Sequence, residues 1–198
     1  MNRPAPAAAP TPSAAPGPLV LAGLVLVAAL TRLLPHPPNF SPVEAIALFG
    51  GAYFAARRWA MIVPLIAMMV SDFALGVIKG GTYLDYFAGA HFLTVYACIV
   101  LCTVLGFGLR RRVTAARVLA YSIAGSVLFF LVTNFAVWAT ASPLDISPAC
   151  TIGLGACYAA AVPFFQWTMF GTLFYGAVLF GGFALLRRQL PVLRAQTM

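Results

Sequence analysis

The chain has 198 residues, of which 62% are hydrophobic and only 8% are charged. A soluble domain carries about 25% charged residues, so this composition excludes an ordinary water-soluble domain and indicates a protein that spans a lipid bilayer. The formal net charge of +8 does not indicate nucleic-acid binding, because the arginines stand in twos and threes beside apolar runs and form no basic stripe interleaved with aromatic residues.

The N-terminal segment consists mainly of alanine and proline. Residues 1–17 cannot build a core, so we expect a disordered cytoplasmic tail. The first predicted span follows at residues 18–34. A cleaved signal peptide is the alternative, because the sequence VAA at 27–29 loosely suits a cleavage site. The preceding segment carries only Arg3 as a positive charge, which favours a retained helix.

Further apolar runs complete an all-α, polytopic membrane bundle of six transmembrane helices over residues 18–188, with 189–198 as a cytoplasmic tail. A spanning helix needs about 20 residues, so the second run is short. The segment between the first two spans, PHPPNFSP, holds four prolines and predicts a stiff non-helical loop. The five further runs are 43–56, 59–79, 91–109, 117–141 and 164–186.

The segment before the last span is rich in glycine and proline. Residues 142–163 therefore predict a long outward loop, in which ACYAAAV forms a short interfacial or re-entrant helix. Cys150 and Cys157 lie in this segment, where an oxidising compartment would join them or they would stay reduced. Cys98 and Cys102 lie within an apolar run and are expected to pack as small hydrophobic residues.

The charged residues sort to opposite ends of the predicted spans. Loops rich in arginine and lysine stay in the cytoplasm, so the sorting places both termini inside. All four acids occur in or near the alternate, outward intervals: Glu44, Asp72, Asp85 and Asp145. Ten of the twelve basic residues lie on the inward side: Arg3, Arg57, Arg58, Arg110, Arg111, Arg112, Arg117, Arg187, Arg188 and Arg194.

Some polar residues lie where a membrane disfavours them. A carboxylate in a spanning helix costs about 2.5–3.5 kcal/mol, so Asp72 either pairs structurally with Arg32 or orients a bound molecule. Asn134 either bonds to a neighbouring helix or contacts a ligand. Trp138 lies one turn from Asn134 and either belongs to the aromatic belt or stacks on a flat ligand.

No cofactor, metal site or enzyme activity is predicted. His36 and His91 with Asp72, Asp85 or Cys150 offer metal-binding atoms, but without the ligand spacing of a metal site. The chain has no nucleophile elbow, phosphate-binding glycine loop, HExxH motif or paired carboxylates. A stripe of small residues, Ala47, Gly51 and Ala55, predicts close helix packing inside the bundle or docking onto a partner protein.

Three segments resemble a family of uncharacterised bacterial membrane proteins. They are RLLPHPPNFSPVEAIALFGGAYFA, PLIAMMVSDFALG and FFLVTNFAVW with the later GLGACYAAAVPFF, which match a PHPPNF loop, a small-residue helix, an SD-x3-G motif and a TNF-x-VW motif. That family is in turn similar to the substrate-binding S-components of energy-coupling-factor vitamin transporters. This second similarity rests on six helices, chain length and a glycine-rich second helix followed by an SD-containing third.

The resemblance implies a multi-pass protein of the bacterial inner membrane that binds a vitamin or related micronutrient under its outer loops. A transmembrane coupling subunit driven by cytoplasmic ATPases would be its partner. The ligand-binding residues implied are Asn39, Asp72, Tyr86, His91, Asn134, Trp138 and Tyr158. S-components usually carry small residues on helix 1, where this chain has mostly leucine and valine. The alternatives are a metal or cation permease using Asp72, the histidines and Glu44, or a non-transporting membrane assembly protein.

Overall fold

The computed structural model describes residues 16–80, 89–141, 148–190 and 193, and these contain helices and connecting segments but no strand. The all-helical prediction is confirmed for these residues. Most of the predicted N-terminal tail, most of the C-terminal tail, Asp85, Tyr86 and Asp145 lie outside them.

Four helices are long and apolar enough to cross a membrane. They are α3 (Arg57–Lys79), α5 (Ala90–Gly106) continued by the turn η2 (Phe107–Leu109), α6 (Ala115–Ala139), and a continuous helix made of α8 (Leu154–Gly176), the π-helical segment η3 (Ala177–Gly181) and α9 (Gly182–Gln189). Together with the composition, these helices characterise a helical membrane protein.

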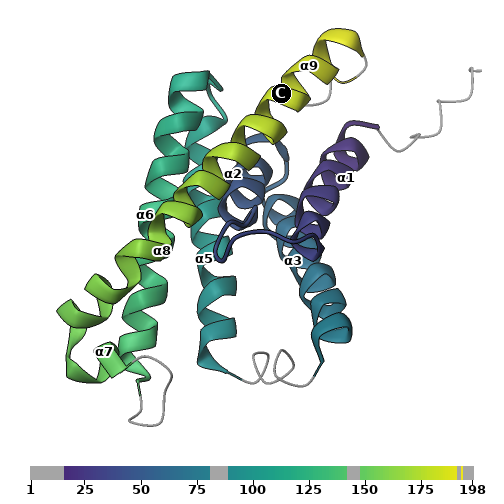
Figure 1. The fold of residues 1–198 in the computed structure, drawn as a ribbon. Helices are drawn as coiled ribbons and strands as arrows, with labels where there is room; N and C mark the ends of the chain where they lie inside the picture. Colours follow the sequence, from purple (N-terminus) through teal and green to yellow (C-terminus); the bar gives the residue numbers. More distant parts are fainter. Residues whose placement is uncertain (1–15, 81–88, 142–147, 191–192, 194–198) are drawn as a thin grey trace, which may run out of the picture.

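The first two helices are shorter, so six full-length spans are not confirmed. Helix α1 (Pro16–Leu30) has 15 residues and α2 (Val43–Tyr53) has 11, which gives lengths of about 22 and 16 Å against a hydrocarbon core of about 30 Å. The turn η1 (Thr31–Leu33) ends the first helix before the prolines. The loop to α2 therefore lies midway between the two ends of the molecule (Figure 1).

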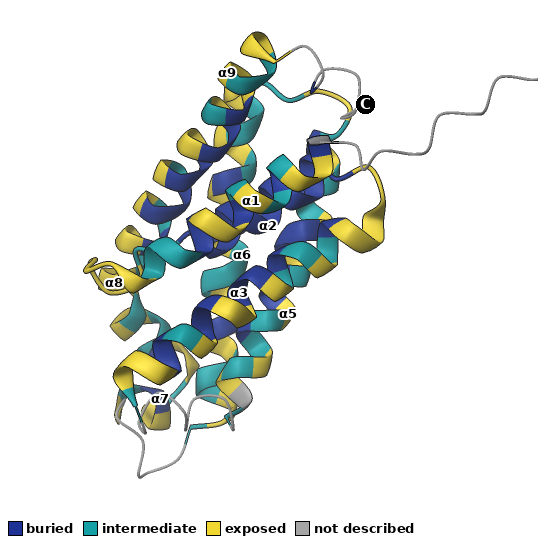
Figure 2. Cartoon of the chain, turned by 90° about the vertical axis from the view of Figure 1, so that its right-hand side faces the viewer, coloured by how far each residue is buried: buried dark blue, intermediate teal, exposed yellow. Residues whose placement is uncertain are grey.

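Helix α2 is the centre of the bundle. It packs against α1, α3, α5, α6 and α8, and all eleven of its residues are buried (Figure 2). Gly51 lies so close to α5 that a Cβ atom there would meet the carbonyl oxygen of Thr103 and the Cα of Gly106. The small residues of α2 thus serve packing inside the bundle, and α2 offers no free face for a partner.

An arginine closes the C-terminal end of α2, where the last carbonyl groups of a helix lack partners within the helix. The guanidinium of Arg110 donates to the carbonyl oxygens of Gly51 at 2.8 Å and Phe54 at 2.7 Å. Burial, and then the nearby charge of Arg57, lower the pKa of Arg110, but a guanidinium stays charged in proteins. One of the inward arginines thus has a structural role.

The predicted outward loop over 142–163 is wrong for most of the part that the structure describes, whereas the short helix predicted at ACYAAAV is helical as part of α8. Helix α7 (Pro148–Ile152) precedes α8, which already begins at Leu154 and runs through Pro163. A proline is tolerated in membrane helices because neighbouring groups satisfy the backbone atoms that it frees. Glycine and proline therefore mark a helix corner here. Cys98 and Cys102 are buried in α5, as predicted.

A disulfide between Cys150 and Cys157 ties α7 to α8. It lies at the end of the molecule that carries α7, opposite the end that carries α9 (Figure 1). Disulfides persist in oxidising compartments, so this bond agrees with the outward side assigned from the charges.

Thiol labelling tests this orientation. In intact cells, an impermeant maleimide should label the protein only after an impermeant reductant has opened the Cys150–Cys157 bond, because Cys98 and Cys102 are buried. The variant with both Cys150→Ser and Cys157→Ser is the control and should not be labelled. If reduction produced labelling only in permeabilised cells, the orientation would be reversed.

Candidate functional site

A cavity of about 170 Å³ lies at the α7 end of the bundle, between the proline loop and the helices α5, α6 and α8. We call it the outer cavity. Its walls combine aromatic rings with amide, hydroxyl and imidazole groups. The lining residues are Asn39, His91, Phe129, Phe130, Thr133, Asn134, Val137, Ala161, Phe164, Phe165 and Thr168.

The proline loop brings Asn39 to this cavity. Asn39 adopts a positive φ of 65°, a conformation that asparagine tolerates better than most residues. The next residue, Phe40, packs its ring 5.7 Å from the ring of Tyr175 on α8. Gly171 allows this contact, since a Cβ there would lie 2.7 Å from the backbone nitrogen of Ser41. The backbone of the proline loop therefore lies directly against α8 at Gly171. This contact holds Asn39 beside α8.

Helix α6 supplies an amide to the wall. The side-chain nitrogen of Asn134 donates to the carbonyl oxygen of Phe130, one turn earlier, at 2.8 Å. No described residue donates to the side-chain oxygen of Asn134, which leaves an acceptor for a bound molecule. The ring of Phe130 lies 4.8 Å from that of Phe165. Amide, imidazole and aromatic faces together suit a small solute with polar groups and one flat or apolar side.

Three of the seven predicted ligand-binding residues thus meet at one cavity: Asn39, His91 and Asn134. They meet because the proline loop reaches α8 in the middle of the bundle, beside the last turns of α6, which carry Asn134. His91 lies at the start of α5 and is exposed.

Asp72 lies elsewhere, although it is buried. Its carboxylate accepts hydrogen bonds from Arg32 at 2.6 Å and from the hydroxyl of Tyr96 at 2.9 Å, and only 1% of its side chain is exposed. Arg32 also donates to Ser71 at 3.3 Å. The ion pair joins the turn η1, at the end of α1, to α3. The structure therefore shows the structural pairing of Asp72 with Arg32.

The other predicted residues do not line the outer cavity. The hydroxyl of Tyr158 donates to the carbonyl oxygen of Leu131 at 2.6 Å, and the ring of Trp138 lies 5.5 Å from that of Phe135. Both side chains contact α6 itself. Tyr86 lies outside the described residues.

Glu44 is the polar residue that sequence reasoning undervalued. It lies in the first turn of α2, its side chain is 1% exposed, and its Oε1 atom has no hydrogen-bond partner in the described residues. An unsatisfied buried polar group costs about 1–3 kcal/mol, and more when charged, whereas the N-terminus of a helix stabilises an anion by about 0.3–1 kcal/mol. The signal in the sequence was a lone acid in the apolar run VEAIALFGGAY.

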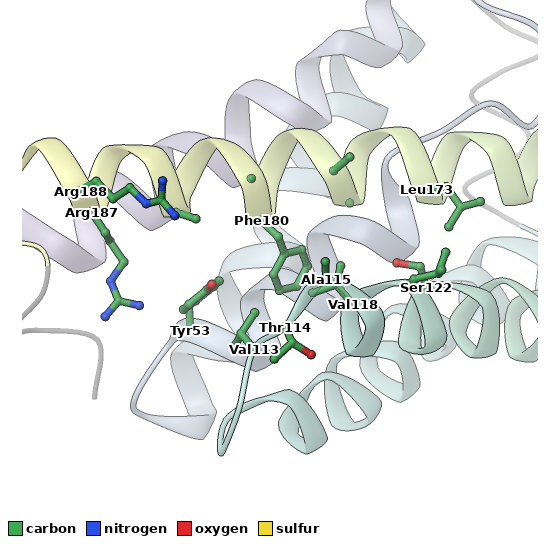
Figure 3. Close-up of a pocket in the computed structure, with 15 residues that line it drawn as sticks. Tyr53, Val113, Thr114, Ala115, Val118, Ser122, Leu173, Phe180, Arg187 and Arg188 are labelled. Atoms are coloured by element: carbon green, nitrogen blue, oxygen red, sulfur yellow. The ribbon is translucent and has the colours of Figure 1, made fainter.

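A larger cavity of about 780 Å³, the inner cavity, lies at the arginine end between α6 and the α8–η3–α9 helix. Its lining is mostly apolar. Ser122 lies toward one end of it, and Arg187 and Arg188 lie toward the other (Figure 3). Polar side chains line this cavity as well, among them Tyr53 and Thr114, but they are spread over a larger and mostly apolar wall, and the volume is in the usual range for ligand sites.

The groups of the permease alternative do not form one site. The nitrogens of His36 approach the carbonyl oxygens of Pro37 and Arg32, at 2.9 and 3.2 Å, within its own loop. Asp72 binds Arg32, and Glu44 lies inside the bundle. Within the described part of the chain, no three histidine, cysteine, aspartate or glutamate residues gather as a metal site.

The sequence matches one protein-family model, described as a family of unknown function (DUF6580), over residues 13–193. No curated protein and no solved structure matches the chain.

Proposed function

Because the chain belongs to DUF6580, a family of unknown function, we propose its function from its own residues: it is an integral inner-membrane subunit that binds a small micronutrient on the outer side for uptake. The observation that carries this proposal is the outer cavity, where Asn39, His91 and Asn134 meet. These residues come from three segments that are far apart in the sequence, and each brings a group that forms hydrogen bonds.

The size of the cavity narrows the substrate class. A volume of about 170 Å³ equals that of about six water molecules and is smaller than the usual 300–1,000 Å³ of ligand pockets. The substrate that fits this conformation is a compact, polar micronutrient with one flat face. A vitamin with a large ring system would require the cavity to widen between the proline loop and α8.

Uptake requires a source of energy, and we assign this role to a coupling subunit driven by cytoplasmic ATPases. Helix α2 is wholly buried, so Ala47 and Gly51 of the predicted stripe of small residues are unavailable for docking, and only Ala55, beyond the end of α2, is exposed. The partner would contact exposed apolar side chains on other helices, such as Ile62, Ile66 and Phe73 of α3.

Native mass spectrometry of the gently purified protein tests the proposal. We expect a co-purified small molecule in the wild-type protein and at least a tenfold lower occupancy in Asn134→Leu, equivalent to about 1.4 kcal/mol of lost binding free energy. Leucine has a similar size but removes the hydrogen-bonding amide of a residue that lines the cavity.

The matched control is Gln166→Leu. Gln166 also carries an amide on an outward helix segment, but it bonds to the carbonyl oxygen of Pro163 and does not line the cavity. Its occupancy should equal that of the wild-type protein. Equal occupancy in the wild-type protein and Asn134→Leu would remove the outer cavity as the binding site.

A further inference from the structure

One face of α8 carries small and polar residues between the two cavities. Thr168 lines the outer cavity and Gly176 lines the inner cavity. Thr172 lies between them, four residues from each, so all three share one helix face. Across from Gly176 lies Ser122 of α6, whose hydroxyl oxygen would be 3.2 Å from a Cβ there. Thr168, Thr172 and Ser122 are buried.

Glu44 lies beside the middle of this face. Its side chain forms a hydrogen bond with that of Thr172, and a Cβ at Gly125 of α6 would be 3.9 Å from the Cβ of Glu44. Oε1 of Glu44 and the hydroxyl oxygen of Ser126 are both buried and lack hydrogen-bond partners in the described residues. The carboxyl group of Glu44 thus lies at the centre of the bundle, where one of its own oxygens and a nearby hydroxyl group have no hydrogen-bond partner.

No described cation balances a charge on Glu44. The titratable groups of α5 that lie near Glu44 are the thiols of Cys98 and Cys102. Helices α6 and α8 contribute hydroxyl groups. From α1 and α3, Arg32 and Asp72 form an ion pair with each other. Arg110 binds carbonyl groups at the other end of α2, about 10 Å along the helix axis from Glu44.

The surroundings of Glu44 indicate its protonation state. The residue is only 1% exposed and its Oε1 atom has no hydrogen-bond partner in the described residues. An isolated carboxylate is costly to bury without a cation or a full set of hydrogen bonds, so these surroundings fit the neutral form of Glu44.

We propose that Glu44 is an exchangeable proton-binding site at the centre of the bundle, reached from the outer cavity along Thr168 and Thr172. The carboxyl O–H bond breaks when the proton leaves, the electron pair stays on Glu44, and water in the outer cavity takes up the proton. This site is independent of the identity of the micronutrient and of the binding role of Asn134.

Infrared spectroscopy of the full-length protein in lipid nanodiscs at neutral pH tests the proposal. The spectrum should contain the carbonyl band of a protonated carboxylic acid, and Glu44→Gln should lose it. Glutamine matches the neutral carboxyl group in size, so the variant should keep its elution volume and melting temperature. Asp72→Asn is the matched control and should keep the band, because the carboxyl group of Asp72 forms an ion pair with Arg32 and lies outside the contacts of Glu44.

Exchange into deuterated water tests the route. The wild-type band should shift promptly, which shows that the proton exchanges with water. Thr172→Val should shift the band frequency and slow the exchange, because it removes the hydroxyl that Glu44 contacts; this variant also tests the proposal if Glu44→Gln does not fold. A wild-type spectrum without the band, a band that persists in Glu44→Gln, or a band that does not exchange would overturn the proposal.

Discussion

Asp72→Ala should lower the free energy of unfolding by about 3 kcal/mol, the lower part of the range for a buried pair, because it leaves the partly buried guanidinium of Arg32 without this partner. The carboxylate of Asp72 binds Arg32 at 2.6 Å and Tyr96 at 2.9 Å, and these bonds tie α1 and α5 to α3. Melting of the detergent-solubilised protein measures the effect. An unchanged melting temperature would mean that the ion pair does not stabilise the bundle.

Two further variants separate the charge pair from its hydrogen bonds. Tyr96→Phe removes one hydrogen bond to Asp72 and should cost about 0.5–1.5 kcal/mol. The double variant Arg32→Met with Asp72→Leu removes both charges and should recover much of the loss in Asp72→Ala, since apolar replacement of a buried pair is often neutral or stabilising.

The double variant also tests the predicted role of Asp72 in ligand binding. If Asp72 serves only as the partner of Arg32, the folded double variant should retain the co-purified molecule. Loss of the molecule from a folded double variant would show that the ion pair also orients the ligand.

Gly51→Ala should be the most damaging single methyl addition among the buried small residues of α2, with a cost of about 3 kcal/mol, the upper part of the usual range for overpacking. The new Cβ would overlap the carbonyl oxygen of Thr103 and lie 3.0 Å from the Cα of Gly106. Both are backbone atoms, so no side-chain rotation relieves the contact, and α2 and α5 must separate. The yield of monodisperse protein and its melting temperature measure this cost.

Gly23→Ala is the matched control. Gly23 also lies within a helix, but nothing approaches within 4 Å of a Cβ placed there. Alanine should therefore stabilise α1 by about 0.8–1 kcal/mol through its higher helix propensity. Equal melting temperatures for Gly51→Ala and the wild-type protein would contradict the close contact between α2 and α5.

The sequence predicted the long apolar helices well, because continuous hydropathy identifies them directly. It overestimated the length of the first two, whose ends are set by a turn and by packing around the proline loop. A hydropathy pattern does not detect helix ends of this kind. It also treated residues 148–163 as a loop with one short helix, because glycine and proline weigh heavily in sequence patterns, although α8 begins at Leu154 and continues through Pro163.

The residues of the outer cavity were partly predictable from the sequence. Asn39, His91 and Asn134 all belong to segments that charge sorting predicts to lie toward the outer side. The rotation of each helix about its own axis is set by packing, and the sequence does not show it. Asp72 and Asn134 therefore looked equivalent, although one faces Arg32 and the other lines the outer cavity. The central position of Glu44 was hidden for the same reason.

The most direct measurement is an experimental density map of the protein purified from its own membranes. We predict density for a small non-protein molecule in the outer cavity, within hydrogen-bonding distance of the side-chain oxygen of Asn134 and beside the rings of Phe130 and Phe165. A map in which protein side chains fill the space between α6, α8 and the proline loop would contradict the account.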